Sequence, residues 1–397
     1  MRIALYHFPS LRAGGDTFIF DLASSLVKCG HSVHIITSNQ FPLVGGKRNL
    51  AMNEILHNIG GAILHEFPFI NVLPHPASIS EIRSILRDCD VLYAKNEIFE
   101  LSQLKILKSG INLPTICGIH TAVFYPYSPS FRSKMHNILY MSKAYAYLLH
   151  QCDAIHVLNG FDLNLMRMHF RVGDSNIFLT RLGVDTDVFY PKNVSKVTHE
   201  DEKLKILFLN KLDEQKGLDI LSDAIQILLD REEFNQMVFT IAGSGKLGDL
   251  AYALSQTYSN VGYLGFVPQE MIVDLYNWHD VVVVPSRWET LSYVCLEAQS
   301  CGVPVIASNI PGPSSIIKHG ETGFLIPPED PKLLAGSILY MYRTKNESPY
   351  AFNEMKNFSR ENIVNRFSLE VEAKNITTLF NFISSRPRSD RVLAYTE

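Results

Sequence analysis

The stretch that decides the fold joins an apolar segment, Val281–Pro285 (VVVVP), to the segment Glu289–Glu297 (ETLSYVCLE). Four consecutive valines are typical of a buried parallel strand. The residues after Ser292 indicate a helix, with a Ser or Thr just before it as the N-cap. Eight helical steps would leave the two glutamates about 80° apart on a helix, so they would not share one face well. We therefore expect Glu289 in the strand-to-helix loop and Glu297 inside the helix, although two solvated acids are the alternative.

The same strand–loop–helix pattern occurs in both halves of the chain. The first half begins with strand Arg2–His7, helix Thr17–Cys29 and strand Ser32–Thr37, which together predict a βαβ unit. The second half restarts the pattern with strand Lys205–Asn210 and helix Leu218–Leu229. Further strands are expected at Gly61–Phe67, Val91–Ala94, Thr115–Gly118, Ala154–Leu158, Val238–Ala242, Val261–Leu264, Val305–Ala307 and Phe324–Ile326.

These elements predict an α/β protein with two doubly wound, Rossmann-like domains that face each other across a cleft. The polar stretch 191–203 separates the halves and has the composition of a linker. We expect domains at 1–192 and 193–366, followed by a helix and tail at 367–397. In open parallel sheets, ligands bind in the loops beyond the carboxyl ends of the strands. Glu289 is expected in such a loop.

Composition excludes several classes of protein. The 397 residues are enough for more than one domain, and the 46% hydrophobic content allows sizeable cores. The net charge of −4 does not indicate a nucleic-acid-binding protein, since such proteins usually carry an excess of positive charge. Six cysteines without C-x-x-C spacing indicate reduced thiols rather than disulfides or zinc. No signal-peptide core and no apolar run near the roughly 18 residues of a membrane span is present, so we expect a cytoplasmic protein, with peripheral membrane contact left open.

Two motifs compete with a site at Glu289. Gly243–Gly248 matches G-x-G-x-x-G and suggests a dinucleotide site, but it follows the second strand of its half, and no acid for a ribose lies about 20 residues further on. Asp88–Asp90 and Asp185–Asp187 match D-x-D, a metal-binding motif, but two acids with one gap also occur by chance. We therefore expect neither a metal nor a resident cofactor.

Several further motifs follow one another in a characteristic order, among them Gly14-Gly15, Gly183–Pro191 (GVDTDVFYP), Lys211–Gly217 (KLDEQKG) and Gly320–Gly323 (GETG). With Glu289–Glu297, this set resembles the retaining glycosyltransferases of GT-B fold, the large family 4 group with its E-x7-E motif. The resemblance covers nearly the whole chain. It implies a final helix that crosses back to the first domain, an acceptor side in the first domain, and a nucleotide-sugar site in the second. The implied donor is a nucleoside-diphosphate sugar, and the implied reaction retains the anomeric configuration.

The residues themselves suit this chemistry. Without a metal, a departing diphosphate is stabilised by lysines, arginines and helix N-termini. Lys211 and Lys216 follow the first strand of the second domain and fit that task, although family members usually have an arginine at position 211. By resemblance, Glu297 accepts hydrogen bonds from the ribose hydroxyls, and Glu289 contacts the transferred sugar. Solvated loop lysines are the alternative for Lys211 and Lys216.

The resemblance implies further contacts around the donor. The backbone amides of Leu291 and Ser292 would face the phosphates, where the family usually has Phe-Gly. Val267, with its neighbour Phe266, would flank the base, and Gly243 belongs to a glycine-rich loop at the cleft. Two residues come from the first half: Gly15, which would let the backbone approach the donor or acceptor, and His120, which would lie near the donor sugar. The alternative for His120 is a structural histidine.

We interpret the chain as a metal-independent, retaining glycosyltransferase with a glycan or lipid-linked acceptor, in surface polysaccharide or glycolipid biosynthesis. A nucleotide-sugar epimerase of the same fold and an inactive, glycosyltransferase-like binding subunit are the alternatives. The segment Tyr125–His150 is aromatic and basic. It could form an amphipathic element at a membrane or an acceptor, or a packed helix with aromatic core contacts.

Overall fold

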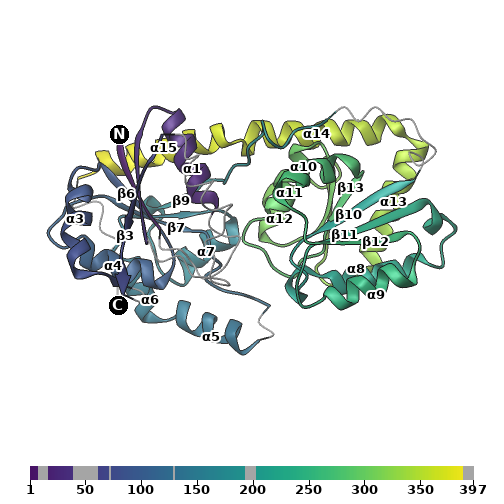
Figure 1. Ribbon diagram of the computed structural model, residues 1–397, viewed down its shortest axis with the longest axis horizontal. Coiled ribbons are helices and arrows are strands. Elements are labelled where there is room, and N and C mark those ends of the chain that lie inside the picture. Colours follow the sequence, from purple (N-terminus) through teal and green to yellow (C-terminus); the bar gives the residue numbers. More distant parts are fainter. Residues whose placement is uncertain (8–16, 39–60, 71–72, 128–129, 193–202, 388–397) are drawn as a thin grey trace. The chain divides into compact units, whose positions relative to one another are not determined.

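The computed structural model describes residues 1–7, 17–38, 61–70, 73–127, 130–192 and 203–387. The chain forms two compact units, one of Met1–Leu182 with Leu369–Glu397, the other of Gly183–Ser368. Each unit is a parallel sheet with helices on both faces (Figure 1). The α/β class with two Rossmann-like domains is confirmed. Within the described residues, no helix has the length and apolar character needed to cross a bilayer.

The first unit contains a seven-stranded sheet in the order β3-β2-β1-β6-β7-β8-β9, with every neighbouring pair parallel. Its strands are β1 (Arg2–His7), β2 (Ser32–Ser38), β3 (Ile63–Phe67), β6 (Val91–Lys95), β7 (Thr115–Ile119), β8 (Ala154–Val157) and β9 (Ile177–Leu179). Its helices are α1 (Thr17–Lys28), α3 (Pro76–Arg87), α4 (Ile98–Leu107), α5 (Phe131–Tyr140), α6 (Lys143–Leu149), α7 (Gly160–Met168) and α15 (Leu369–Ser385); β4 (Phe69–Ile70) and β5 (Leu73–Pro74) form a small antiparallel pair.

The second unit contains a six-stranded sheet in the order β12-β11-β10-β13-β14-β15, again parallel throughout. Its strands are β10 (Leu204–Leu209), β11 (Met237–Ala242), β12 (Val261–Gly265), β13 (Val281–Val284), β14 (Val305–Ser308) and β15 (Gly323–Ile326). Its helices are α8 (Leu218–Leu228), α9 (Gly248–Thr257), α10 (Gln269–Trp278), α11 (Tyr293–Ser300), α12 (Pro311–Ile316), α13 (Pro331–Glu347) and α14 (Pro349–Phe367).

The unit boundaries differ from the predicted ones for a packing reason. The structure divides the chain after Leu182, earlier than the predicted boundary after residue 192. The segment that follows belongs to the second unit because Phe189 is buried in that unit's core and its carbonyl accepts hydrogen bonds from Ser300 and Arg360. The sequence pattern that looked like the end of the first domain is thus the start of the second.

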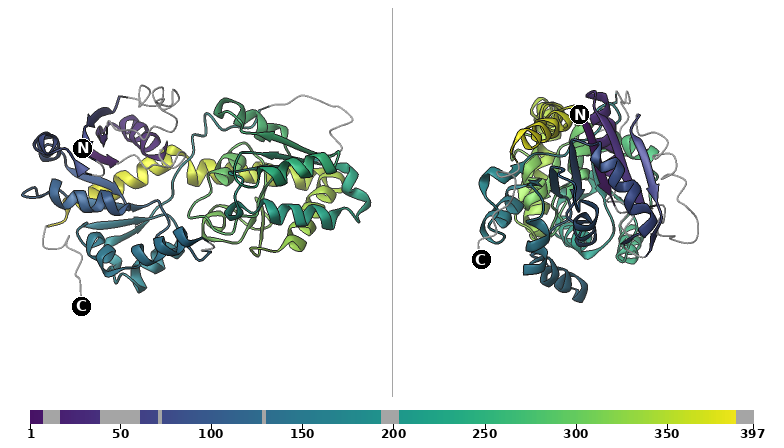
Figure 2. Two further views of the ribbon diagram at one scale, coloured as in Figure 1. Left: turned by 60° about the horizontal axis from the view of Figure 1, so that its bottom comes forward. Right: turned by 90° about the vertical axis from the view of Figure 1, so that its left-hand side faces the viewer.

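The final helix packs on the first unit. α15 lies beside α1 (Figures 1 and 2), and His31, between α1 and β2, is 3.0 Å from Thr377 of α15 through Nε2 and Oγ1. The return of the chain to the first domain is therefore confirmed, but the helix begins at Leu369 rather than at 367, because α14 ends at Phe367 and Ser368 lies between the two helices in extended conformation.

Candidate functional site

The order of the strands creates a topological switch point in the second unit. β10 and β13 are adjacent in the sheet, but the chain runs outward from them in opposite directions, to β11 and β12 on one side and to β14 and β15 on the other. The β10–α8 and β13–α11 loops therefore leave the sheet side by side. Ligands of open α/β sheets bind at such a point. Both loops contain residues that the sequence analysis selected.

Glu289 and Lys216 meet between these loops. Lys216 Nζ is 2.8 Å from Glu289 Oε1, and Ser286 Oγ donates to the same oxygen at 2.7 Å. Glu289 is only 5% exposed, whereas the Lys216 side chain is 23% exposed. The carboxylate is thus held by two donors, and the Lys216 side chain is partly accessible to solvent. Such an arrangement orients an acid while leaving a cation able to meet an anionic ligand.

Two hydrogen bonds and a close backbone approach hold the two loops against each other. Arg287 N donates to Gln215 O at 2.8 Å, and Gln215 Nε2 donates to Trp288 O at 2.9 Å. Gly217 has a φ of 76°, and a Cβ there would lie 2.1 Å from Pro285 O. Only glycine permits both the left-handed conformation and this close approach. The Lys216–Glu289 pair therefore rests on a rigid backbone junction.

Arg287, in the β13–α11 loop, adds further contacts between the two loops. Its guanidinium donates to Asp219 Oδ1 at 2.9 Å and Oδ2 at 2.6 Å, to Glu329 at 2.9 Å and to Glu214 O. Burial alone would raise the pKa of Asp219, but the hydrogen bonds and charge of Arg287 lower it below its ordinary value. The sequence analysis missed Arg287, because its carboxylate partners are distant in the chain. These contacts give Arg287 a positioning role.

Glu297 lies inside α11, as predicted, and Glu289 lies in the loop before it. Tyr276 Oη, from α10, donates to Glu297 Oε2 at 2.8 Å. Tyr276 is fully buried, and burial, followed by the charge of Glu297, raises the pKa of its hydroxyl well above the usual value. The tyrosine thus holds the carboxylate in a defined orientation. No sequence signal marked Tyr276 as this partner.

The other residues chosen in the second unit lie in strand-to-helix loops or at the start of a helix. Ser292 occupies the N-cap position of α11 with φ −117°, so the glycine usual in the family is not required there, and Leu291 contacts the close-packed Gly312. Val267 follows β12 and is half-buried, beside the exposed Phe266. Lys211 lies in the β10–α8 loop, where its ammonium is 3.3 Å from Asp213 Oδ2 and its side chain is 72% exposed.

Gly243 serves the packing of neighbouring loops. With φ 132°, it brings the β11–α9 loop so close to the β10–α8 loop that a Cβ would lie 1.8 Å from Asn210 O. The G-x-G-x-x-G match therefore has a structural cause in this loop contact.

Three buried polar atoms near the same edge of the sheet, Asn210 Nδ2, Asp213 Oδ1 and Ser308 Oγ, have no hydrogen-bond partner among the described residues. Unsatisfied buried groups of this kind suit a polar ligand.

The D-x-D motifs have structural partners. Asp185 Oδ1 accepts from Asp187 N at 2.9 Å and from Val188 N at 3.2 Å, which caps a turn. Asp90 Oδ2 accepts from Arg2 N at 2.7 Å, and Asp88 is the C-cap of α3. Among the described residues, no group of three or more His, Cys, Asp and Glu side chains is arranged to hold a metal ion.

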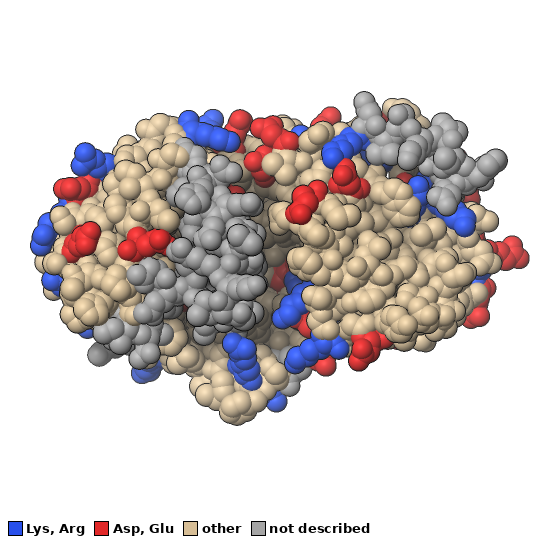
Figure 3. All heavy atoms as spheres, viewed as in Figure 1, with Lys and Arg blue, Asp and Glu red and all other residues tan. Residues whose placement is uncertain are grey.

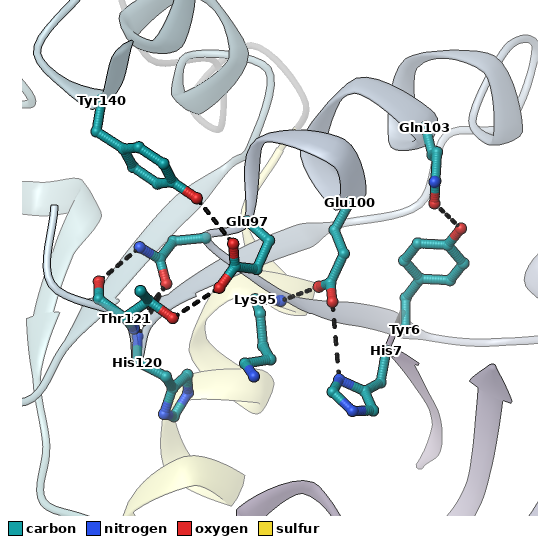
Figure 4. Close-up of polar contacts among 10 residues, drawn as sticks. Tyr6, His7, Lys95, Glu97, Glu100, Gln103, His120, Thr121 and Tyr140 are labelled. Carbon is teal, nitrogen blue, oxygen red and sulfur yellow. Dashed lines mark hydrogen bonds and ion pairs between the residues drawn. The ribbon is translucent and has the colours of Figure 1, made fainter. Parts of the chain in front are cut away.

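The first unit gathers polar side chains at its own switch point, between β1 and β6 (Figure 4). His7 ends β1, Lys95 ends β6, and His120 follows β7; Figure 4 shows the Lys95 side chain between the two histidines. Glu100 of α4 is 3.7 Å from His7 Nδ1, and it accepts from Lys95 N at 3.0 Å. The sequence analysis selected His120 and missed His7 and Lys95, although each is a polar residue at the end of a buried strand.

His120 is held by neutral partners. Its Nε2 lies 2.6 Å from Tyr93 Oη, and its backbone N donates to Asn96 Oδ1 at 3.1 Å. Burial, then the neighbouring His156, Lys95 and His7, lower the pKa of His120 well below the usual histidine value. The ring is therefore neutral at physiological pH, and its surroundings disfavour the protonated form. Gly15, the remaining predicted residue of the first half, lies outside the described residues.

The fold and these two switch points define a GT-B architecture. Residues 190–358 match the family described as "Glycosyl transferases group 1", and residues 12–188 match "Glycosyltransferase Family 4". The chain is thus similar to a family 4-like glycosyltransferase domain over its first half and to a group 1 glycosyltransferase domain over its second half.

Curated relatives are similar in sequence to this chain over part of their length. An uncharacterised glycosyltransferase of Methanocaldococcus jannaschii is 33% identical over 186 residues, which cover 46% of this chain and 45% of the relative. A D-inositol 3-phosphate glycosyltransferase of Paenarthrobacter aurescens is 32% identical over 44% of this chain and 45% of its own length. The chain thus aligns with about half the length of the curated relatives it matches.

Solved structures match over almost the whole chain. Sucrose-phosphate synthase of Thermosynechococcus elongatus superposes with a TM-score of 0.71 at 18% identity, covering 96% of this chain and 98% of that one. The HepE protein of Anabaena in complex with UDP superposes with a TM-score of 0.70 at 16% identity, covering 96% and 100%. At these identities the likeness establishes the fold.

Proposed function

We propose that the chain is a retaining, metal-independent glycosyltransferase that moves a sugar from a nucleoside diphosphate to a glycan or lipid-linked acceptor. The observation that carries the proposal is the Lys216–Glu289 pair at the switch point of the second unit. Lys216 would neutralise charge on the departing diphosphate. Glu289 would orient the transferred sugar, and Glu297 would accept hydrogen bonds from the ribose.

Two observations support a nucleotide-sugar donor. The site offers the ammonium of Lys216 and the N-termini of α8 and α11 to an anionic diphosphate. Structures of HepE with UDP, with UDP and glucose, and with UDP-glucose have the same fold. Lys211, Gly243, Val267, Leu291 and Ser292 remain proposed donor contacts. Surface polysaccharide or glycolipid assembly in the cytoplasm, with contact to a membrane surface, completes the proposal.

Incubation of the purified chain with UDP-glucose and a panel of glycan and lipid-linked acceptors tests the reaction. We expect acceptor-dependent release of UDP, undiminished by EDTA, and a product whose first-formed linkage has the donor's anomeric configuration by NMR. Loss of activity in EDTA that manganese restores would overturn metal independence. An inverted linkage would overturn retention. Conversion of the nucleotide sugar without any acceptor would instead identify an epimerase.

A further inference from the structure

The helix α5 carries an apolar stripe on its outward side. Phe131 is 80% exposed, Met135 45%, Ile138 65% and Leu139 51%. At about 100° per residue, these four side chains fall within an arc of about 100° on the helix. The spacing is that of an amphipathic helix, but here the apolar side is in solvent. An exposed stripe of this kind marks an interaction surface.

The opposite side of α5 fastens the helix to its unit. Tyr140 is buried and donates to Glu97 Oε2 at 2.8 Å, and Asn137 exchanges two hydrogen bonds of 2.8 Å with the backbone of Tyr125. His136 lies 2.8 Å from Ala122 O and stacks on Tyr140. The stripe is therefore held outward by a defined set of contacts, so the helix need not refold to present it.

Positive charge flanks the stripe. Arg132 and Lys134 lie on either side of it by helical position, and both are exposed. Neither forms an ion pair with a residue that the structure describes. Between Glu100 and Asp153 the sequence contains no acidic residue, but five Lys and Arg. The chain as a whole has a net charge of −4, so this cationic segment is a local departure from its average.

We propose that α5 docks the protein on a bilayer that contains anionic lipids. The apolar stripe would enter the acyl boundary, and Arg132 and Lys134 would meet the negative headgroups, as interfacial helices do. Figure 3 agrees with this, since the lobe at the position of α5 is mostly tan, with blue at its edge, in that view. The proposal specifies the surface for the membrane contact suggested above and does not depend on the enzymatic reaction.

A protein partner fits these observations less well. A helix of 10 residues is about 15 Å long and about 10 Å wide, so its outward side offers roughly 150 Å². A stable protein interface needs about 800 Å² on each partner. If two copies of the chain met through this stripe, the Arg132 and Lys134 side chains of both copies would lie close together and repel each other. A lipid surface needs no such area from one helix and supplies the opposite charge.

Vesicle flotation tests the proposal with the full chain. We expect binding to phosphatidylcholine vesicles that contain phosphatidylglycerol, little binding to phosphatidylcholine alone, and weaker binding as salt rises. The double substitution Phe131→Ser with Ile138→Ser, and separately Arg132→Gln with Lys134→Gln, should each lower the bound fraction by about tenfold. These side chains are exposed, so the variants should fold, which circular dichroism would check.

Met168→Ser is the matched control. Met168 is 83% exposed on α7 of the same unit, but it stands outside the stripe. This variant should bind anionic vesicles as the unchanged chain does. Equal binding by the α5 variants, or binding that does not distinguish anionic from neutral vesicles, would overturn the proposal. Self-association in the absence of lipid that the Phe131→Ser/Ile138→Ser variant abolishes would show instead that the stripe joins two copies of the chain.

Discussion

At the scale of single residues, Glu289 and Glu297 of the second unit differ in their burial and in their hydrogen-bond partners. Glu289 is buried against an ammonium and a hydroxyl, whereas Glu297 is half-buried and held by a tyrosine. A carboxylate whose cation faces solvent can share that cation with an arriving diphosphate. A carboxylate oriented by a neutral hydroxyl can accept hydrogen bonds from ribose hydroxyls, because each carboxylate has several acceptor sites. The two glutamates should therefore affect different steps.

Substitution of each glutamate should reveal this division. Glu297→Ala should weaken UDP binding by roughly 1.5–3 kcal/mol, the value of hydrogen bonds to a charged group. Glu289→Ala should leave UDP affinity unchanged or slightly tighter, because Lys216 is no longer neutralised, but should lower the rate of transfer. Isothermal titration calorimetry and initial rates measure the two effects.

Glu297→Gln serves as the control, since it keeps an acceptor for the Tyr276 hydroxyl and should preserve the thermal stability that Glu297→Ala can lose. If both alanine variants weakened UDP to the same extent, the assigned roles would be wrong.

The charge of Lys216 should matter more than the ring of His120. Lys216→Ala removes the cation next to the proposed leaving group, so we expect kcat to fall by about 10²-fold or more, in the range seen when one electrostatic donor is lost. His120→Ala should slow transfer without abolishing it, because the leaving diphosphate can itself accept the acceptor's proton. Steady-state kinetics with both variants decides the order. A larger loss with His120→Ala would indicate that the histidine is the principal base.

At the scale of elements, the site depends on the junction of two strand-to-helix turns. The β10–α8 and β13–α11 loops approach each other at Gly217 and Pro285, and hydrogen bonds through Gln215 hold them together. The distance between Lys216 and Glu289 depends on this junction, because each residue lies on one of the two loops. A change in the backbone of either loop should therefore alter the site, even where no polar group is lost.

Gly217→Ala should disturb both stability and nucleotide binding. The new methyl group would lie 2.1 Å from Pro285 O at a φ of 76°, so the loops must separate. We expect a loss of at least about 1–3 kcal/mol in the free energy of unfolding, together with weaker UDP binding. Gly336→Ala is the matched control, because Gly336 lies within α13 and a methyl group there would meet no atom within 4 Å. This control should be neutral or stabilising by up to about 1 kcal/mol. Equal effects of the two changes on denaturation would exclude the role assigned to the junction.

At the scale of the whole molecule, each unit buries a histidine that is neutral in the folded state. Burial lowers the pKa of His156 in the first unit to about 4 and that of His279 in the second to about 4, from 6.5. His156 is fully buried between Tyr93 and Thr180, at 2.7 Å and 2.6 Å. Since unfolding exposes both rings, the unfolded chain binds protons that the folded chain does not.

Stability should therefore fall on acidification. The contribution of each histidine is intact above pH 6.5, the unfolded value, and is lost progressively as the pH falls toward about 4. At pH 5 we expect roughly 2 kcal/mol less stability per histidine than at pH 7. Urea denaturation at several pH values measures this. His156→Gln should reduce the difference between pH 7 and pH 5, and an unchanged difference would assign the acid sensitivity to other groups.

The sequence by itself determined the elements and the local position of the two glutamates. β1 and β13 begin and end at the predicted residues, and the other predicted strands of the described residues are present within a few residues of their predicted ends. Apolar runs and helix-capping residues act over a few positions, so their pattern can be recognised without the fold. The placement of Glu289 before α11 and of Glu297 within it follows from the same local signals.

Only the tertiary structure decided which side chains meet. Lys216 pairs with Glu289, Tyr276 with Glu297, and Arg287 with Asp219, while Lys211 pairs with its neighbour Asp213 instead. The grouping of His7 and Lys95 with His120 likewise depends on β1 and β6 being adjacent in the sheet. Strand order and loop packing join residues that are far apart in the chain. No local pattern records such contacts, because their free energy arises only when the sheet is assembled.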